Sequence, residues 1–206
     1  MVRAAQRKSG LLSCGLFLAC AFVSAQQQPA AAPLDISGQI LLRGRLTPYL
    51  IRHLPVSSFP ELPTTAQNYL RQRGCLIPQT YQAHGPENVV HLRLEGPSTS
   101  DWAVLCSVQR TVSLLVFFGS SPGQPHVLAT AQETECLQSH DPSPVLGFNW
   151  GIDAASPRRI HEAQSGLKER QPWLDHDALA DSLLDRHTVY HFYSGTAWTL
   201  LNVPDN

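Results

Sequence analysis

Polar and apolar positions alternate most regularly in the middle of the chain. Four short runs there are rich in β-branched and aromatic residues and are separated by turn-forming residues. They are Asn88 to Glu95, Asp101 to Val108, Thr111 to Phe118 and Pro125 to Ala131. This pattern predicts an antiparallel β meander.

The second run shows the alternation most clearly, because successive side chains of a strand point to opposite faces. Its residues divide into two sets, Trp102, Val104, Cys106 and Val108 on one face and Ala103, Leu105 and Ser107 on the other. Cys106 is therefore expected to lie in the middle of a strand and to be buried.

Helical spacing is found on both sides of this region. A first helix is predicted from Pro63 to Arg73, with Gly74 at the position of a left-handed C-terminal cap. A second is predicted from Ala178 to Asp185, because two leucines four residues apart would share its buried face and Asp177 can cap its start.

Three further segments extend the sheet or border it. Val145 to Ile152 predicts a strand, whereas Pro157 to Gln164 is equally compatible with a helix or a strand. Thr188 to Tyr193 and Thr196 to Leu201, joined by Ser194-Gly195, predict a closing β-hairpin.

The segment Leu34 to Pro63 has no clear period. Ile40-Leu41-Leu42 could begin a strand, but the four prolines that follow favour an extended, irregular path over the surface. The expected fold is a single α+β domain over residues 34–206. An antiparallel β meander dominates it, with two or three short helices and a C-terminal β-hairpin.

The first 25 residues have the three parts of a secretory signal. Basic residues come first, then the apolar run Leu11 to Val23, then a small-residue cleavage site ending at Ala25. Residues 26–33 (QQQPAAAP) predict a flexible linker. A rival interpretation is a lipoprotein signal, in which Cys20 would be acylated. The protein is therefore expected to be exported, to the periplasm or beyond the cell.

Charge excludes one class of partner. Cleavage after Ala25 removes three basic residues and leaves 12 Lys and Arg against 16 Asp and Glu, a formal charge of −4. Nucleic-acid binding, which needs a basic face, is not expected. The mature chain also has no apolar run of the length that a transmembrane helix needs.

Export makes the cysteine count informative. Cys75, Cys106 and Cys136 follow the signal, which predicts one disulfide and one free thiol in an oxidising compartment. Pairing of Cys75 with Cys106 is favoured, because the proline-containing segment after Cys75 needs anchoring. Cys106 with Cys136 is the alternative. The remaining thiol, Cys136 in the favoured pairing, is expected to be idle.

Ser121 lies in a Gly-x-Ser-x-Gly pattern that is typical of hydrolase nucleophiles. Pro122 follows it and has no N–H to donate to an oxyanion, and the next residues cannot begin a helix. The segment is therefore interpreted as a loop between two strands. No catalytic residue is predicted here.

Two other groups of residues are candidates for binding or chemistry. Asp175, His176 and Asp177 form the densest polar cluster, and Trp150 and Trp173 could provide an aromatic platform for a sugar. The spacing of histidines and cysteines fits no known metal motif. No metal and no cofactor is predicted.

Two motifs, Arg73-Gly74-Cys75-Leu76-Ile77-Pro78-Gln79 and Asp101-Trp102-Ala103-Val104-Leu105-Cys106-Ser107, carry a resemblance. With Asn88-Val89-Val90, Asp175-His176-Asp177 and the Trp198 hairpin, the chain resembles a group of exported bacterial proteins to which no activity is assigned. The resemblance covers most of the chain from His53 onward. It supports the pairing of Cys75 with Cys106 and implies no reaction.

The first hypothesis for function is a non-catalytic domain that binds an envelope protein or a glycan. A secreted hydrolase with its site at Asp175-His176-Asp177 is the second. A structural accessory protein of the cell envelope is the third.

Overall fold

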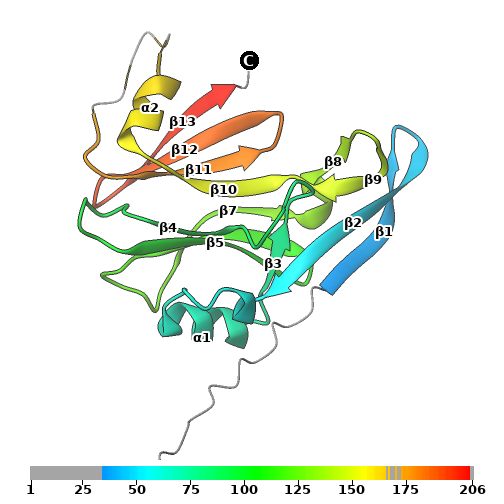
Figure 1. Ribbon diagram of the computed structural model, residues 1–206, viewed down its shortest axis with the longest axis horizontal. Coiled ribbons are helices and arrows are strands. Elements are labelled where there is room, and N and C mark those ends of the chain that lie inside the picture. Colours follow the sequence, from blue (N-terminus) through cyan, green and yellow to red (C-terminus); the bar gives the residue numbers. More distant parts are fainter. Residues whose placement is uncertain (1–33, 166, 168–169, 171–172, 205–206) are drawn as a thin grey trace, which may run out of the picture.

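The computed structural model describes residues 34–165, 167, 170 and 173–204. The predicted signal and linker, with Cys20, lie outside the described residues. The described chain is rich in β-structure, with thirteen strands in two sheets and two α-helices, in a single domain (Figure 1). The α+β prediction is confirmed at this level.

The large sheet is not a simple meander. Its strands are β1 (Leu34–Leu42), β2 (Arg45–Pro55), β3 (Leu76–Gln79), β4 (Val89–Leu92), β5 (Asp101–Val108), β6 (Thr111–Phe117), β7 (His126–Gln132), β8 (Leu137–His140) and β9 (Ser143–Phe148). They are ordered β7-β6-β5-β3-β2-β9-β8, with β1 paired to β2 and β4 paired to β5. The pairing of β2 with β9 is parallel, which brings two segments that are distant in sequence side by side.

The small sheet follows the chain. It contains β10 (Trp150–Ala155), β11 (Ala178–Leu183), β12 (His187–Tyr193) and β13 (Trp198–Pro204) in that order. All three pairings are antiparallel. The predicted C-terminal hairpin is confirmed as β12 and β13.

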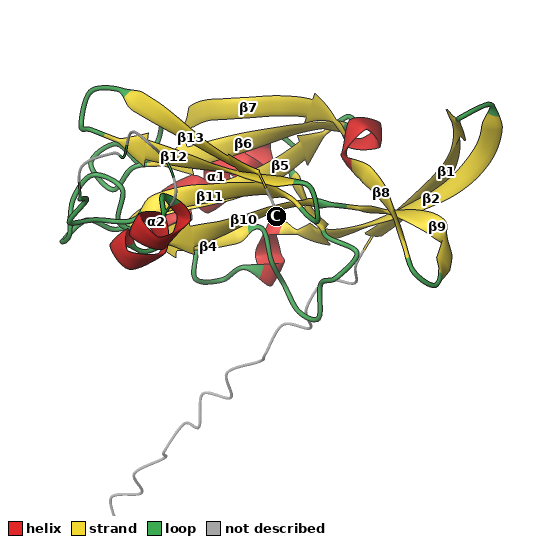
Figure 2. Cartoon of the chain, turned by 90° about the horizontal axis from the view of Figure 1, so that it is seen from above, coloured by secondary structure: helices red, strands yellow, loops and turns green. Residues whose placement is uncertain are grey.

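The two sheets pack face to face, and one helix covers each outer face (Figures 1 and 2). α1 (Thr64–Gln72) lies on the large sheet and α2 (Pro157–Ala163) on the small sheet. The main core fills the space between the sheets. A second core lies under α1 and a third under α2.

β5 has buried side chains on both faces, in the alternation expected from its sequence. Ala103 and Leu105 belong to the core between the sheets. Trp102, Val104 and Cys106 belong to the core under α1. A strand covered on both faces is therefore the common wall of two cores.

The two helices agree with local sequence signals. α1 is followed by Gly74, whose φ of +67° is the left-handed conformation that a glycine cap allows. In α2, Ser156 Oγ accepts a hydrogen bond from Arg159 N, and Pro157 is the first helical residue. No helix among the described residues is long and apolar enough to cross a membrane.

The irregular surface path predicted for the start of the domain is wrong. β1 and β2 form a long antiparallel hairpin around a two-residue turn, in which Arg43 has φ +50° and Gly44 has φ +76°. Pro48 lies inside the ladder opposite Gln39, and Pro55 is the last residue of β2. The prolines therefore do not break the strand.

The helix predicted from Ala178 to Asp185 is also wrong, because most of this segment is strand β11. Leu179 belongs to the main core, whereas Ala178 and Ala180 belong to the core under α2. Residues four apart share a face in a strand as well as in a helix, so the leucine spacing does not distinguish the two. Asp177 consequently caps no helix.

Val145 to Ile152 is two strands rather than one. β9 ends at Phe148 and β10 begins at Trp150, so the chain crosses from the large sheet to the small sheet at Asn149. Asn149 N donates to the carbonyl of Cys136, and Asn149 O accepts from Leu184 N. These backbone bonds hold the crossover in place.

Candidate functional site

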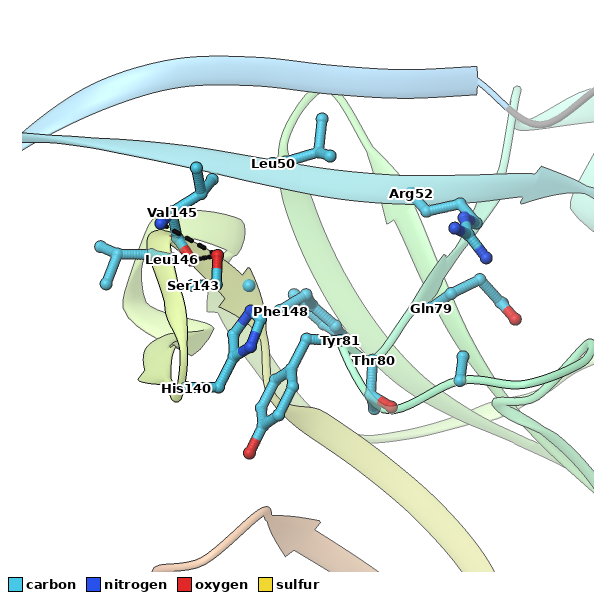
Figure 3. A pocket seen from close by; sticks show the side chains of 12 residues that line it. Leu50, Arg52, Gln79, Thr80, Tyr81, His140, Ser143, Val145, Leu146 and Phe148 are labelled. Atoms are coloured by element: carbon cyan, nitrogen blue, oxygen red, sulfur yellow. Dashed lines mark hydrogen bonds between the residues drawn. The ribbon is translucent and has the colours of Figure 1, made fainter.

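A pocket of about 200 Å³ opens beside β2, between the 79–83 segment and the β8–β9 hairpin (Figure 3). We call it the Tyr81 pocket. Its lining residues are Leu50, Arg52, Gln79, Thr80, Tyr81, Ala83, His140, Ser143, Val145, Leu146, Gly147 and Phe148. They come from three segments of the chain that are far apart in sequence.

Two aromatic rings form one wall of the pocket. The rings of Tyr81 and His140 are stacked, with centroids 4.3 Å apart and planes within 5° of parallel. They lie close to Gly147 of β9, where an added Cβ would collide with Cβ of Tyr81 and come within 3.2 Å of His140 Nε2. Glycine at this position is therefore what lets the aromatic pair approach the strand.

The hydroxyl of Tyr81 is anchored outside the pocket. It donates to Asp185 Oδ2 at 2.8 Å, in the turn that joins the two middle strands of the small sheet. Partial burial, and then the neighbouring Asp185 carboxylate, raise the pKa of Tyr81 above its ordinary value. Tyr81 therefore stays neutral, and its ring is fixed at both ends.

Arg52 supplies the charge of the site. It extends from β2 near Gln79, across the pocket from the stacked rings (Figure 3). Among the described residues no carboxylate pairs with its guanidinium, and neither ring nitrogen of His140 has a hydrogen-bond partner. Both groups are therefore available to a ligand.

Buried amides hold the segment that carries Tyr81. The Gln79 side chain donates to the carbonyls of Ile77 and Glu87 and accepts from Glu87 N. The side-chain amide of Asn88 donates to Pro78 O and Trp150 O. Gln79 and Asn88 therefore fix this loop.

Asp101, the first residue of the second motif, has a similar structural role. Its buried carboxylate accepts the backbone N–H groups of Leu94, Glu95 and Gly119. It also accepts the hydroxyl of Thr99. Asp101 therefore fixes the loop before β5 to the end of β6.

A second polar cluster, which the sequence did not indicate, has a buried centre formed by His53, Ser107 and Glu133. Glu133 Oε1 lies 2.7 Å from His53 Nε2 and accepts the hydroxyl of Ser107 at 2.5 Å. Arg110 lies 3.6 Å from the other carboxylate oxygen. Burial alone would raise the pKa of Glu133, but His53, Ser107 and Arg110 together lower it below its ordinary value. Because the side chains of His53 and Glu133 are almost completely buried, we interpret this cluster as one that stabilises the fold.

The predicted polar site at residues 175–177 is occupied by internal contacts. Asp177 Oδ2 accepts from the backbone and the side chain of Arg93, each at 3.1 Å. His176 has Nδ1 at 2.8 Å from Asp175 Oδ1 and Nε2 at 3.1 Å from the carbonyl of Tyr193. The hydrogen bond with His176 lowers the pKa of Asp175. Both nitrogens of His176 therefore already have partners within the protein.

The two tryptophans predicted as a platform are not equivalent. Trp150 is only 4% exposed and belongs to the main core, with its indole N–H donating to Asp181 at 2.5 Å. The exposed position expected for Trp150 is therefore wrong. Trp173 is 65% exposed and lies 5.0 Å, centroid to centroid, from His161.

The cysteine prediction is confirmed. Cys75 and Cys106 form a disulfide with Cα atoms 5.4 Å apart, and it lies in the core under α1. Among the described cysteines, Cys136 is free and buried. Burial raises its pKa to about 12, and neighbouring carboxylates add to the effect, so the thiol is not a nucleophile at neutral pH.

Ser121 lies in the loop between β6 and β7, as expected. Its N–H donates to the carbonyl of Phe118, and its own carbonyl accepts from Gln124 N. β7 follows, not a helix. Among the described residues, no three His, Cys, Asp or Glu side chains gather closely enough to hold a metal ion.

Comparison with known proteins gives no match of the chain to a family model, to a curated protein or to a solved structure. The Tyr81 pocket is therefore interpreted from its own geometry.

Proposed function

We propose that the protein is an exported, non-catalytic binding domain that takes one acidic sugar unit of a glycan in the Tyr81 pocket. The observation that carries the proposal is the stacked pair Tyr81–His140 opposite the unpaired guanidinium of Arg52. The disulfide is consistent with an exported protein.

The size and chemistry of the pocket favour this ligand class. Its volume of about 200 Å³ is below the range of roughly 300 to 1,000 Å³ of pockets for drug-sized ligands, so it suits a single ring. An aromatic wall offers apolar contact to the C–H face of such a ring. Arg52 offers two parallel N–H groups, the geometry that a carboxylate prefers.

The same residues favour binding over catalysis. Hydrolysis of a glycosidic bond commonly uses two carboxylates, and none of the described lining residues carries one. The Ser143 hydroxyl already donates to the carbonyl of Val145 at 3.1 Å. At the alternative hydrolase site, His176 is held between Asp175 and Tyr193. The hydrolase and accessory-protein hypotheses have less support than ligand binding.

The test is calorimetric titration of the purified protein with glucuronic acid and with glucose. We expect the acid to bind about tenfold or more tightly than the neutral sugar, the range of one charge-assisted hydrogen bond. Arg52→Gln should remove this preference, and His140→Ala should weaken binding of both sugars. Arg45→Gln is the matched control, an exposed arginine of the same strand outside the pocket.

Binding that Arg52→Gln and His140→Ala leave unchanged would overturn the proposal, as would failure to bind either sugar. Hydrolysis of any glycan that His176→Ala abolishes would instead favour the hydrolase hypothesis.

A further inference from the structure

The turn of the β1–β2 hairpin exposes apolar side chains at the end of a projection. The tip, Leu41 to Leu46 (LLRGRL), stands away from the body of the domain (Figure 2). Leu41 and Leu46 are paired across the hairpin and are 70% and 64% exposed, and Leu42 is 44% exposed. Such a set of large apolar side chains on a convex tip is unfavourable in water unless another surface covers it.

The tip is also basic. Arg43 and Arg45 flank Gly44 at the turn, and both are exposed. They line a groove of about 610 Å³ on one side of the hairpin, into which Arg186 also faces. The acid among its lining residues, Glu135, already accepts a backbone N–H from Gln132. Among the described residues, no carboxylate forms an ion pair with any of the three arginines.

The positive charge of the groove is a local feature. The chain after Ala25 carries a formal charge of −4, yet the groove has three arginines against one glutamate. Its other lining side chains include Ile40 and Leu42, so an anionic group and an apolar group could be held side by side.

We propose that the tip docks on the surface of an anionic phospholipid membrane. Leu41, Leu42 and Leu46 enter the interface between headgroups and acyl chains. Arg43 and Arg45 bind lipid phosphates, with Arg186 beside them in the groove. Apolar insertion combined with cationic contacts is the established physical basis of interfacial membrane binding.

The extent of the patch favours a lipid surface over a protein. The tip has six residues, whereas a standard protein interface uses roughly 20 to 30 residues on each side. Away from the tip, the face of the hairpin that carries Leu41 and Leu46 is polar along β1, at Asp35, Ser37 and Gln39, and is apolar only at Pro48 and Leu50 of β2. A membrane needs only the tip itself.

The experiment is flotation of the protein with lipid vesicles of two compositions, phosphatidylcholine alone and phosphatidylcholine with phosphatidylglycerol. The protein is produced with its own N-terminus, and every variant carries the same N-terminal segment, so differences between variants report on the tip. We expect much stronger binding to the anionic vesicles, and weaker binding in about 0.5 M salt, which screens charge beyond roughly 4 Å.

Two double variants separate the contribution of the arginines to vesicle binding from that of the leucines. Arg43→Gln with Arg45→Gln should weaken binding to anionic vesicles by about fivefold for each arginine, the value of one cationic contact at a membrane surface. Leu41→Ser with Leu46→Ser should weaken binding by tenfold or more. All four side chains are exposed, so the variants should fold, which thermal unfolding verifies.

Two matched controls lie elsewhere on the surface. Leu200→Ser removes an exposed leucine of β13, and Arg158→Gln removes an exposed arginine of α2. Both should bind vesicles as the unchanged protein does. Equal binding by the unchanged protein and the leucine variant would overturn the proposal. So would a change of oligomeric state in the tip variants with vesicle binding unaffected, which would assign the tip to contact between copies of the chain.

Discussion

Glu133 and His53 form a buried pair, in which Glu133 Oε1 lies 2.7 Å from His53 Nε2. Neither side chain is more than 1% exposed. Removing one partner of such a pair leaves the other without compensation. Glu133→Gln should therefore lower the free energy of unfolding by about 3 kcal/mol, measured by urea denaturation. Glu162→Gln, which alters an exposed ion pair on α2, should change it by less than about 0.5 kcal/mol.

The same pair gives stability a defined dependence on pH. The pKa of Glu133 is lowered in the folded protein relative to its ordinary value of 4.5. Its contribution is therefore complete above pH 4.5 and is lost as the pH falls through the folded pKa. The stability difference between the unchanged protein and Glu133→Gln should narrow as the pH falls below 4.5. A difference that stays constant throughout that range would show that Glu133 is not the titrating group.

Cys136 should resist alkylation in the folded protein. Burial raises its pKa to about 12, so the thiolate is a very small fraction of the thiol at neutral pH. Iodoacetamide should label it at least about 100-fold more slowly in buffer than in denaturant, because unfolding restores an ordinary thiol. Peptide mapping by mass spectrometry locates the label. Rapid labelling of native Cys136 would contradict the buried position.

Gly147→Ala should disrupt the Tyr81 pocket. The added Cβ would collide with Tyr81, so the loop that carries this ring must move. We expect about 1 to 3 kcal/mol of lost stability, the usual cost of overpacking, with weaker sugar binding in the same titration. Gly85→Ala is the matched control. Gly85 lies in the loop that carries Tyr81, and its added Cβ would meet nothing within 4 Å. Normal binding by Gly147→Ala would contradict the assigned geometry.

Loss of the disulfide should destabilise the domain substantially. It closes a loop with a sequence separation of 31, for which the chain-entropy model gives about 4 kcal/mol. The double variant Cys75→Ala with Cys106→Ala should show this loss in denaturant unfolding. Unfolding the unchanged protein under reducing conditions gives an independent value for the stability that the disulfide contributes. A midpoint that neither change lowers would contradict a stabilising role.

The sequence predicted those elements whose signals are local. The alternation from Trp102 to Val108 identified β5 and both of its faces, because side-chain direction in a strand depends only on position. The sequence that begins at Ser156-Pro157 is compatible with either a helix or a strand. The structure resolves it as a capped helix.

Two wrong predictions from the sequence, the helix from Ala178 to Asp185 and the irregular path from Leu34 to Pro63, have physical explanations. Leu179 and Leu183 share a face in either geometry, and pairing with β10 and β12 decides for a strand. For β1 and β2, Arg43-Gly44 is a weaker turn signal than Asn-Gly, and long-range pairing outweighs the local effect of Pro48.

Local sequence patterns do not predict the candidate site. Arg52, Tyr81 and His140 meet because β9 pairs in parallel with β2, a contact between residues almost one hundred positions apart. No spacing of residue types reports such a pairing. The same is true of Glu133 and His53, which are 80 positions apart.

The position of β5 also affects how the domain unfolds. Since one strand bounds both the core between the sheets and the core under α1, neither core can be exposed to water without disturbing the other. We therefore expect the two cores to unfold as one cooperative unit, with the backbone amides of Ala103, Val104 and Leu105 among the slowest to exchange their hydrogens with solvent.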